Sequence, residues 1–274
     1  MHASVISMAA LAACALAAPK FPQLDLDAAQ PGSLEAVSEY FNLLAYKVQE
    51  SRYLREAPAC DLSKAQQPIA PTPLPPPTAG LILKHVAIGR GTQNYTCDAN
   101  NATAVPVANG ALATLFNASC VAAAYPDMLN MLPRVALLFN LTAPPVPSES
   151  APVLSPASVR MAPSNLTVSG VHFFTNATTP YFNLDTDGGL SLGQIPCAKN
   201  NTADAPADAP RGQEGETAVP WLKLIAKDGA TGDLQEVYRV ETAGGSAPAT
   251  CEGMPASFEV QYSAQYWFYS GKPE

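Results

Sequence analysis

Two histidines and two aspartates are the residues of this sequence best suited to acid–base chemistry. His85 and His172 lie in stretches of alternating polarity, and Asp185 and Asp187 follow in a glycine-rich stretch. A histidine beside a carboxylate can move protons or hold a metal ion. One hypothesis is therefore a hydrolase or metal-dependent enzyme that uses His172 with Asp185 and Asp187. A structural role, with each histidine hydrogen-bonded within a strand, is favoured because neither has an acidic neighbour in sequence.

Two motifs near these aspartates lack the context that their chemistry needs. Residues 189–193 have the G-x-S-x-G spacing of a nucleophile elbow, but no histidine follows them in the chain. Residues 183–188 resemble the start of a calcium loop, but the twelfth position is Gln194 rather than glutamate. We interpret both motifs as turns, in which Asp and Gly are common. An irregular oxygen-ligand site is the alternative for the second motif.

Three aromatic residues form a candidate ligand-binding face. Trp221, Trp267 and Tyr269 fall on the outer, polar face of the strands predicted for them. Exposed aromatic rings can bind ligands, here by stacking on sugar rings. The alternative is that a loop or helix covers them. The helix predicted from Ser33 and the proline-rich residues 68–77 are available as covers.

The start of the chain and its sequons indicate export. Residues 1–17 have the apolar run and the small-x-small ending of a secretory signal sequence. No other stretch approaches the roughly 20 apolar residues of a membrane span, so we expect a soluble, extracellular protein after cleavage. Seven Asn-x-Ser/Thr sequons predict a glycoprotein whose modified asparagines lie on the surface. The sequons begin at Asn94, Asn101, Asn117, Asn140, Asn165, Asn176 and Asn200.

The cysteines agree with an oxidising compartment. The chain has six, and Cys14 lies in the expected signal sequence. The five that remain allow two disulfides and one free thiol, with the pairing open at this point. No pair has zinc-site spacing, so we expect the cysteines to form structural disulfides rather than a metal site. No cofactor is expected. The five are Cys60, Cys97, Cys120, Cys197 and Cys251.

Composition excludes several classes of protein. The 274 residues include 15 basic and 23 acidic side chains, a net charge of -8, and the cations are scattered singly. Nucleic-acid binding is not expected, because phosphates need clustered Lys and Arg. Hydrophobic residues make up 47% of the chain and charged residues 14%, which suffices for a sizeable core and argues against general disorder.

The hydrophobic periodicity predicts one helix followed by a series of strands. Residues 33–56 have helical spacing, and the proline-rich residues 68–77 must be extended. Residues 141–163 and 202–216 are typical of long loops, and a short helix is expected at 126–132. Strands are expected at 81–97, 111–121, 167–174, 221–227, 234–242 and 258–269.

These elements favour a mainly β fold, either an antiparallel β-sandwich or a flattened barrel, with an N-terminal helix and long Pro-rich loops. The expected divisions of the chain are the signal sequence (1–17), the helix with its proline-rich spacer (18–78) and the β domain (79–274).

Alternation assigns side chains to the two faces of the strands. If Asn94 is glycosylated it points outward, so Tyr95 and Cys97 point toward the core. By the same argument Asn117 points outward and Cys120 inward, where disulfides could join the sheets. The inward positions of the last strand are Phe258, Val260, Tyr262, Ala264, Tyr266 and Phe268.

Residues 89–97, 219–224 and 238–245, and Cys251 before a Tyr- and Phe-rich final strand, carry a resemblance to a known family. Over about residues 79–270 the chain resembles the DUF3455 family of secreted fungal and bacterial proteins, which has no established activity. The resemblance implies a Cys97–Cys251 disulfide. Some fungal members carry the label malate dehydrogenase. This chain lacks the glycine fingerprint and the alternating βαβ pattern of a dinucleotide-binding fold, so that activity is not expected.

The favoured hypothesis is a non-catalytic, secreted glycoprotein whose β domain binds a cell-wall glycan, a small ligand or another protein. A secreted hydrolase or metal-dependent enzyme is the alternative. The ligand and the oligomeric state do not follow from the sequence.

Overall fold

The computed structural model describes residues 33–54, 59–139, 159–186 and 189–271. The predicted signal sequence, Asn140 and Asp187 lie outside these residues. The described helices are α1 (Ser33–Ser51), α2 (Ser119–Ala124), α3 (Pro126–Leu137) and a 3₁₀ turn, η1 (Leu62–Lys64). The strands are β1 (Ile82–Thr96), β2 (Val107–Asn117), β3 (Arg160–Met161), β4 (Leu166–Asn176), β5 (Thr179–Asp185), β6 (Ser191–Ala203), β7 (Trp221–Ala226), β8 (Leu234–Gly244) and β9 (Ser257–Ser270).

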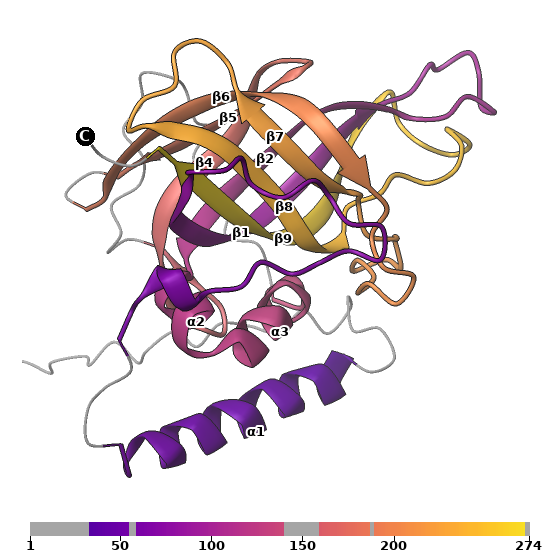
Figure 1. The fold of residues 1–274 in the computed structure, drawn as a ribbon. Helices are drawn as coiled ribbons and strands as arrows, with labels where there is room; N and C mark the ends of the chain where they lie inside the picture. Colours follow the sequence, from indigo (N-terminus) through magenta and orange to yellow (C-terminus); the bar gives the residue numbers. More distant parts are fainter. Residues whose placement is uncertain (1–32, 55–58, 140–158, 187–188, 272–274) are drawn as a thin grey trace, which may run out of the picture.

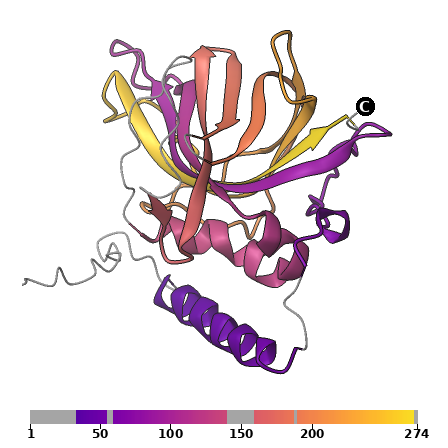
Figure 2. The same ribbon diagram turned by 90° about the vertical axis from the view of Figure 1, so that its left-hand side faces the viewer.

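Eight antiparallel strands close into a barrel (Figures 1 and 2). Their order is β2-β1-β9-β8-β7-β6-β5-β4, and β2 also pairs with β4, which joins the two ends of the sheet. The short β3 pairs only with β4 among the described strands. The sequence allowed either a β-sandwich or a flattened barrel. The pairing of β2 with β4 closes the sheet into a barrel.

Side chains fill the interior of the barrel, where large rings face small residues. The buried ring of Tyr266 on β9 lies against Gly89 on β1, where a Cβ atom would come within 2.4 Å of the ring. A side chain at position 89 would therefore displace the tyrosine. Phe182 on β5 packs edge-on against Tyr266 and Phe268, at centroid distances of 5.4 and 5.5 Å. The eight strands thus enclose a packed core.

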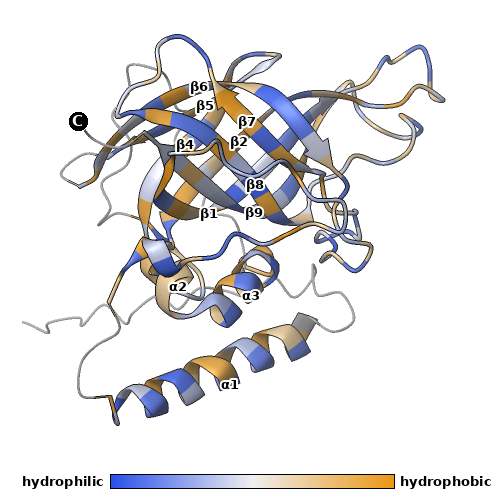
Figure 3. Cartoon of the chain, in the orientation of Figure 1, coloured by the Kyte–Doolittle hydropathy of each residue, from blue (hydrophilic) through white to orange (hydrophobic). Residues whose placement is uncertain are grey.

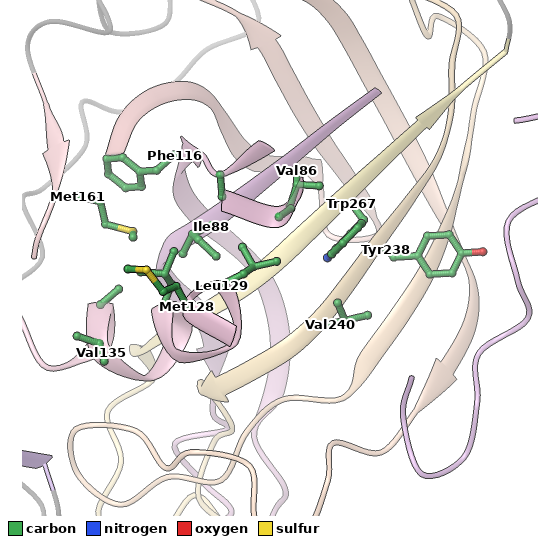
Figure 4. Packing of buried hydrophobic residues seen from close by; sticks show 14 of the residues in the cluster. Val86, Ile88, Phe116, Met128, Leu129, Val135, Met161, Tyr238, Val240 and Trp267 are labelled. Atoms are coloured by element: carbon green, nitrogen blue, oxygen red, sulfur yellow. The ribbon is translucent and has the colours of Figure 1, made fainter. Parts of the chain in front are cut away.

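A second core lies outside the barrel, between β1, β8, β9 and the helices (Figure 4). Val86 and Ile88 alternate with the inward-facing Ala87 and therefore belong to this outer cluster. α3 turns its apolar face to them, because its hydrophobic residues recur every three or four positions. α1 contacts α3, and hydrophobic and hydrophilic residues are mixed along its length (Figure 3).

A buried arginine ties α3 to the barrel. The Arg90 side chain, on β1, donates hydrogen bonds from Nε to the Ala136 carbonyl and from Nη2 to the Phe139 carbonyl, at 3.2 Å each. These carbonyls lie at or just beyond the C-terminal end of α3, where a cation is favoured; the Ala136 carbonyl also accepts a hydrogen bond from the Phe139 amide at 3.3 Å. Arg90 therefore serves as a cap for α3.

The proline-rich segment, residues 65–80, crosses the outside of the barrel with no regular secondary structure (Figure 1). Lys223 Nζ donates to the Pro76 carbonyl at 2.9 Å, and the Tyr238 hydroxyl donates to the Pro75 carbonyl at 2.8 Å. Ala70 is buried in the outer cluster. The segment thus covers β7, β8 and β9. It is one of the two elements that the sequence analysis named as available covers for the aromatic residues.

Two features of the strands differ from the sequence prediction. β5 and β6 are additional strands, which flank the Asp- and Gly-rich turn that the sequence does predict. The strand expected at 111–121 ends at Asn117, because the Asn117 side chain accepts a hydrogen bond from the Ser119 amide and α2 begins there. Cys120 therefore lies on a helix and is exposed, so its predicted inward orientation in a strand is wrong.

Candidate functional site

His172 lies in the barrel interior, away from Asp185. The register of β4 and β5 places His172 opposite Phe182, and the two rings stack at 4.2 Å. Its Nδ1 lies 3.0 Å from the Tyr181 carbonyl. Burial lowers the pKa of His172 to about 3, although the Tyr181 carbonyl opposes the shift. The imidazole is therefore buried and neutral.

His85 is also buried, between two serine hydroxyls. Its Nε2 lies 2.9 Å from Ser169 Oγ on β4, and its Nδ1 lies 2.9 Å from Ser119 Oγ at the start of α2. Burial lowers the pKa of His85 to about 4. Ser119 Oγ also accepts a hydrogen bond from the Val86 amide. This histidine therefore joins β1, β4 and α2 and is 2% exposed.

Asp185 closes the turn between β5 and β6. Its Oδ1 accepts a hydrogen bond from the Gly193 amide at 2.8 Å, and Gln194 Nε2 lies 3.4 Å from Oδ2. Ser191, the serine of the elbow-like motif, is exposed and pairs with Asp185 in the sheet. The structure therefore does not bring His172 and Asp185 together as an acid–base pair, and Asp187 lies outside the described residues.

The three aromatic residues of the candidate ligand face are buried. Trp221 and Trp267 are 1% and 0% exposed and belong to the outer cluster, and Tyr269 donates its hydroxyl hydrogen to Gln67 Oε1 of the proline-rich segment. Trp267 Nε1 donates to Gln265 Oε1 at 3.0 Å. The face is thus covered, as the alternative interpretation held. In this structure the rings stabilise the outer core and offer no open surface to a sugar.

An ion pair lies buried under the same cover. Lys223 Nζ is 3.1 Å from Glu236 Oε1, and the two side chains are 7% and 6% exposed. Thr78 completes the arrangement by donating from its hydroxyl to Glu236 Oε1 at 2.6 Å and from its amide to Oε2 at 3.2 Å. Because both charges are hydrogen-bonded, the pair can persist away from water.

Two disulfides join segments far apart in the chain. Cys97 and Cys251 form one of them, the pairing implied by the family resemblance. Cys60 and Cys120 form the other, which joins the chain just before η1 to α2. Cys197 is the free cysteine among the described residues; it is buried, and burial raises the pKa of its thiol. A buried thiol with a raised pKa is a poor nucleophile.

Six of the seven sequons fall on described residues. Four of their asparagines are exposed, and Asn94 and Asn117 are half-buried. Tyr95, next to Asn94, points inward as predicted, and its hydroxyl donates to the Gly245 carbonyl at 2.8 Å. The exposed asparagines are Asn101, Asn165, Asn176 and Asn200.

The barrel contains a polar centre that the sequence analysis did not predict. The Arg239 side chain, on β8, points into the barrel, where it lies beside Tyr266, His172 and Tyr262. The Tyr262 and Tyr266 hydroxyls are 2.8 Å apart. Arg239 shares the inward face with Val237, two residues before it, while Tyr238 and Val240 belong to the outer cluster. The register irregularity between Leu234 and Glu236 places Leu234 on the inward face as well.

A surface hollow of about 450 Å³ lies between the C-terminal end of α3 and residues 207–213; we call it the α3 hollow. Arg134, Asp208 and Arg211 are among the residues that line it, and Arg211 Nη1 donates to the Gly215 carbonyl at 2.9 Å. Gln213 Nε2 donates to the Leu137 carbonyl at 2.8 Å and so fixes the loop against the helix. The hollow is therefore preformed and carries charge of both signs, with two cations to one anion.

Neither a metal centre nor a membrane span is recognised in the parts of the chain that the structure describes. These residues contain no group of three or more His, Cys, Asp or Glu side chains placed to hold a metal ion. No described helix is both long enough and apolar enough to cross a bilayer.

Comparison with known proteins identifies a family for most of the chain. Residues 77–270 match the model of the family described as a protein of unknown function, DUF3455. No curated protein and no solved structure matches the chain. The match covers the whole barrel and the helices α2 and α3, and it begins within the proline-rich segment. The chain is therefore a member of the DUF3455 family.

Proposed function

We propose that this protein is a secreted, non-catalytic binding domain that takes a polar extracellular ligand in the α3 hollow. The signal-like residues 1–17, the sequons and the two disulfides support secretion. The neutral, buried state of both histidines supports a role without catalysis, because neither can exchange protons with a ligand at the surface.

The volume and lining of the α3 hollow carry the proposal. About 450 Å³ falls within the range of small-ligand sites. Arg134 and Arg211 place two guanidinium groups there on a protein whose net charge is -8. Guanidinium groups recognise carboxylates through paired hydrogen bonds, and Asp208 can accept hydrogen bonds from hydroxyl groups. A glycan with acidic sugars combines carboxylates and hydroxyls, so it is the ligand class that fits best.

The test is binding of the full chain to immobilised polygalacturonate and, for comparison, to a neutral β-glucan. We expect retention on polygalacturonate, and a loss of affinity of about tenfold or more in the Arg134→Ala plus Arg211→Ala variant, equivalent to about 1.4 kcal/mol. Arg160→Ala removes an exposed arginine elsewhere and should bind as the wild type does. Equal binding by the double variant, or no binding of the wild type to either polymer, would refute the α3 hollow as the site.

A further inference from the structure

Arg239 is a buried cation without a countercharge. Its side chain is 8% exposed, and none of the ion pairs among the described residues includes it. On the same strand, Glu236 lies on the outer face and pairs with Lys223. Glu241 is half-buried, burial raises its pKa, and none of the ion pairs among the described residues includes it. Burying a charge is costly unless an opposite charge or several hydrogen bonds compensate it.

The groups around Arg239 do not supply the missing negative charge. The guanidinium interacts with the Tyr266 hydroxyl as a hydrogen-bond donor, and Tyr95, Tyr262 and His172 are also close to it. Burial raises the pKa of all three tyrosines, so their hydroxyls are neutral. His172 is neutral and could only add positive charge. The protein thus surrounds this cation with neutral rings.

Hydrogen-bond donors are in excess at the same place. Arg239 Nη2 donates to the Pro220 carbonyl at 2.9 Å, but Nε has no partner among the described residues. The Gln93 side chain interacts with the Tyr262 hydroxyl and lowers its pKa, but its buried amide nitrogen has no hydrogen bond of good geometry among the described residues. The hydrogen bond between the Tyr262 and Tyr266 hydroxyls uses only one of their two protons. The groups left over are therefore mainly donors.

The backbone keeps these groups together at one end of the barrel. A bulge in β8 between Val240 and Ala243, with Glu241 at a φ of 47°, turns the strand just after Arg239. Gly245 lies against Tyr262 and Gln93, and a Cβ atom there would come within 2.7 Å of Tyr262. Bulges of this kind often lie next to functional sites, where they orient a side chain.

We propose that the barrel interior beside Arg239 and Gln93 binds a small monovalent anion, either a halide or the carboxylate of a small acid. One negative charge matches the single guanidinium, and an anion accepts hydrogen bonds from each of the unused donors. The size is limited by the packed core around it. This inference is independent of the α3 hollow.

The test is thermal unfolding of the full chain, with its disulfides intact, at constant ionic strength in chloride, bromide, acetate or bulky gluconate. We expect the midpoint to rise with the concentration of the small anions, by about 5–10 °C at 100 times the dissociation constant, and not with gluconate. Acetate separates the carboxylate source from the halides. Bromide soaked into crystals should give an anomalous peak beside Arg239 Nε.

Arg239→Met should abolish the dependence on the anion, and Arg160→Met, an exposed control, should retain it. Gln93→Leu keeps the cation but removes a hydrogen-bond donor, so it should weaken anion binding about tenfold. This variant tests the proposal if Arg239→Met does not fold. Equal midpoints in all four salts, or the same response in the wild type and Arg239→Met, would overturn the proposal.

Discussion

The buried ion pair of Lys223 and Glu236, with side chains 7% and 6% exposed, predicts a large loss of stability when one of its two charges is removed. Glu236→Gln leaves Lys223 buried without its partner, so we expect the free energy of unfolding to fall by about 3–5 kcal/mol in urea titrations. Lys223→Met combined with Glu236→Leu should recover most of this loss. Glu50→Gln, at the exposed Lys47–Glu50 pair, is the control and should change stability by less than about 1 kcal/mol. Similar losses for Glu236→Gln and Glu50→Gln would contradict the prediction.

The two buried histidines predict a defined dependence of stability on pH. Burial lowers their pKa values to about 4 and about 3, against 6.5 for the ordinary side chain. The unfolded chain therefore binds more protons below pH 6.5, and the contribution to stability is complete above pH 6.5 and is lost as the pH falls toward 4.

We expect His172→Phe to reduce the slope of unfolding free energy against pH between 6 and 5 by up to about 1.4 kcal/mol per pH unit. Phenylalanine can keep the stack on Phe182 but cannot take up a proton. Urea unfolding at a series of pH values measures the slope. An unchanged slope in His172→Phe would show that this histidine is already protonated in the folded protein.

At the scale of elements, α3 depends on a residue from another strand. Arg90→Met removes the hydrogen bonds from β1 to the Ala136 and Phe139 carbonyls and leaves these acceptors buried. We expect a loss of about 2–4 kcal/mol of stability, because hydrogen bonds to charged groups contribute about 1.5–3 kcal/mol. Helical circular dichroism and urea unfolding check this. Arg160→Met should have the stability of the wild type. An equal loss in Arg160→Met would show that the effect does not come from the hydrogen bonds between Arg90 and α3.

Cys60, which precedes the proline-rich segment, forms a disulfide with Cys120 that closes a loop of 60 residues. Cys60→Ala with Cys120→Ala should cost about 4 kcal/mol from loop entropy. The only two tryptophans of the chain, Trp221 and Trp267, belong to the cluster that contains Ala70 of this segment, so loosening of the cover should shift their fluorescence to the red. Cys197→Ala is the control for cysteine removal. Unchanged fluorescence and stability in the double variant would show that the disulfide does not hold the cover.

On the scale of the whole molecule, exposure predicts where glycans attach. Asn101, Asn165, Asn176 and Asn200 are exposed and should carry glycans when a eukaryotic host secretes the chain, whereas Asn117 is half-buried and should be less occupied. Glycopeptide mass spectrometry after enzymatic release measures the occupancy at each site. Full glycan occupancy at Asn117, with none at the four exposed asparagines, would contradict the prediction that exposure determines occupancy.

Much of the fold follows from local patterns. Alternation places Tyr262, Ala264, Tyr266 and Phe268 inward, and helical spacing predicts α1, because these signals depend only on neighbouring residues. β5 and β6 are missed because their hydrophobic alternation is interrupted by Asn, Gln and Pro, and the Asp- and Gly-rich turn between them dominates the local signal. The beginning of α2 is missed because the Asn117 side chain ends β2.

The sequence by itself determined the β class, the expected export and the family resemblance, since each depends on composition or on short stretches of chain. Only the tertiary structure decided that the strands form a closed ring, that Trp221 and Trp267 are covered, and that His172 and Asp185 lie apart. It also placed Arg239 among neutral rings inside the barrel. The reason is physical: burial, countercharge and pairing depend on residues distant in sequence, and the register irregularities in β8 change which face each side chain takes.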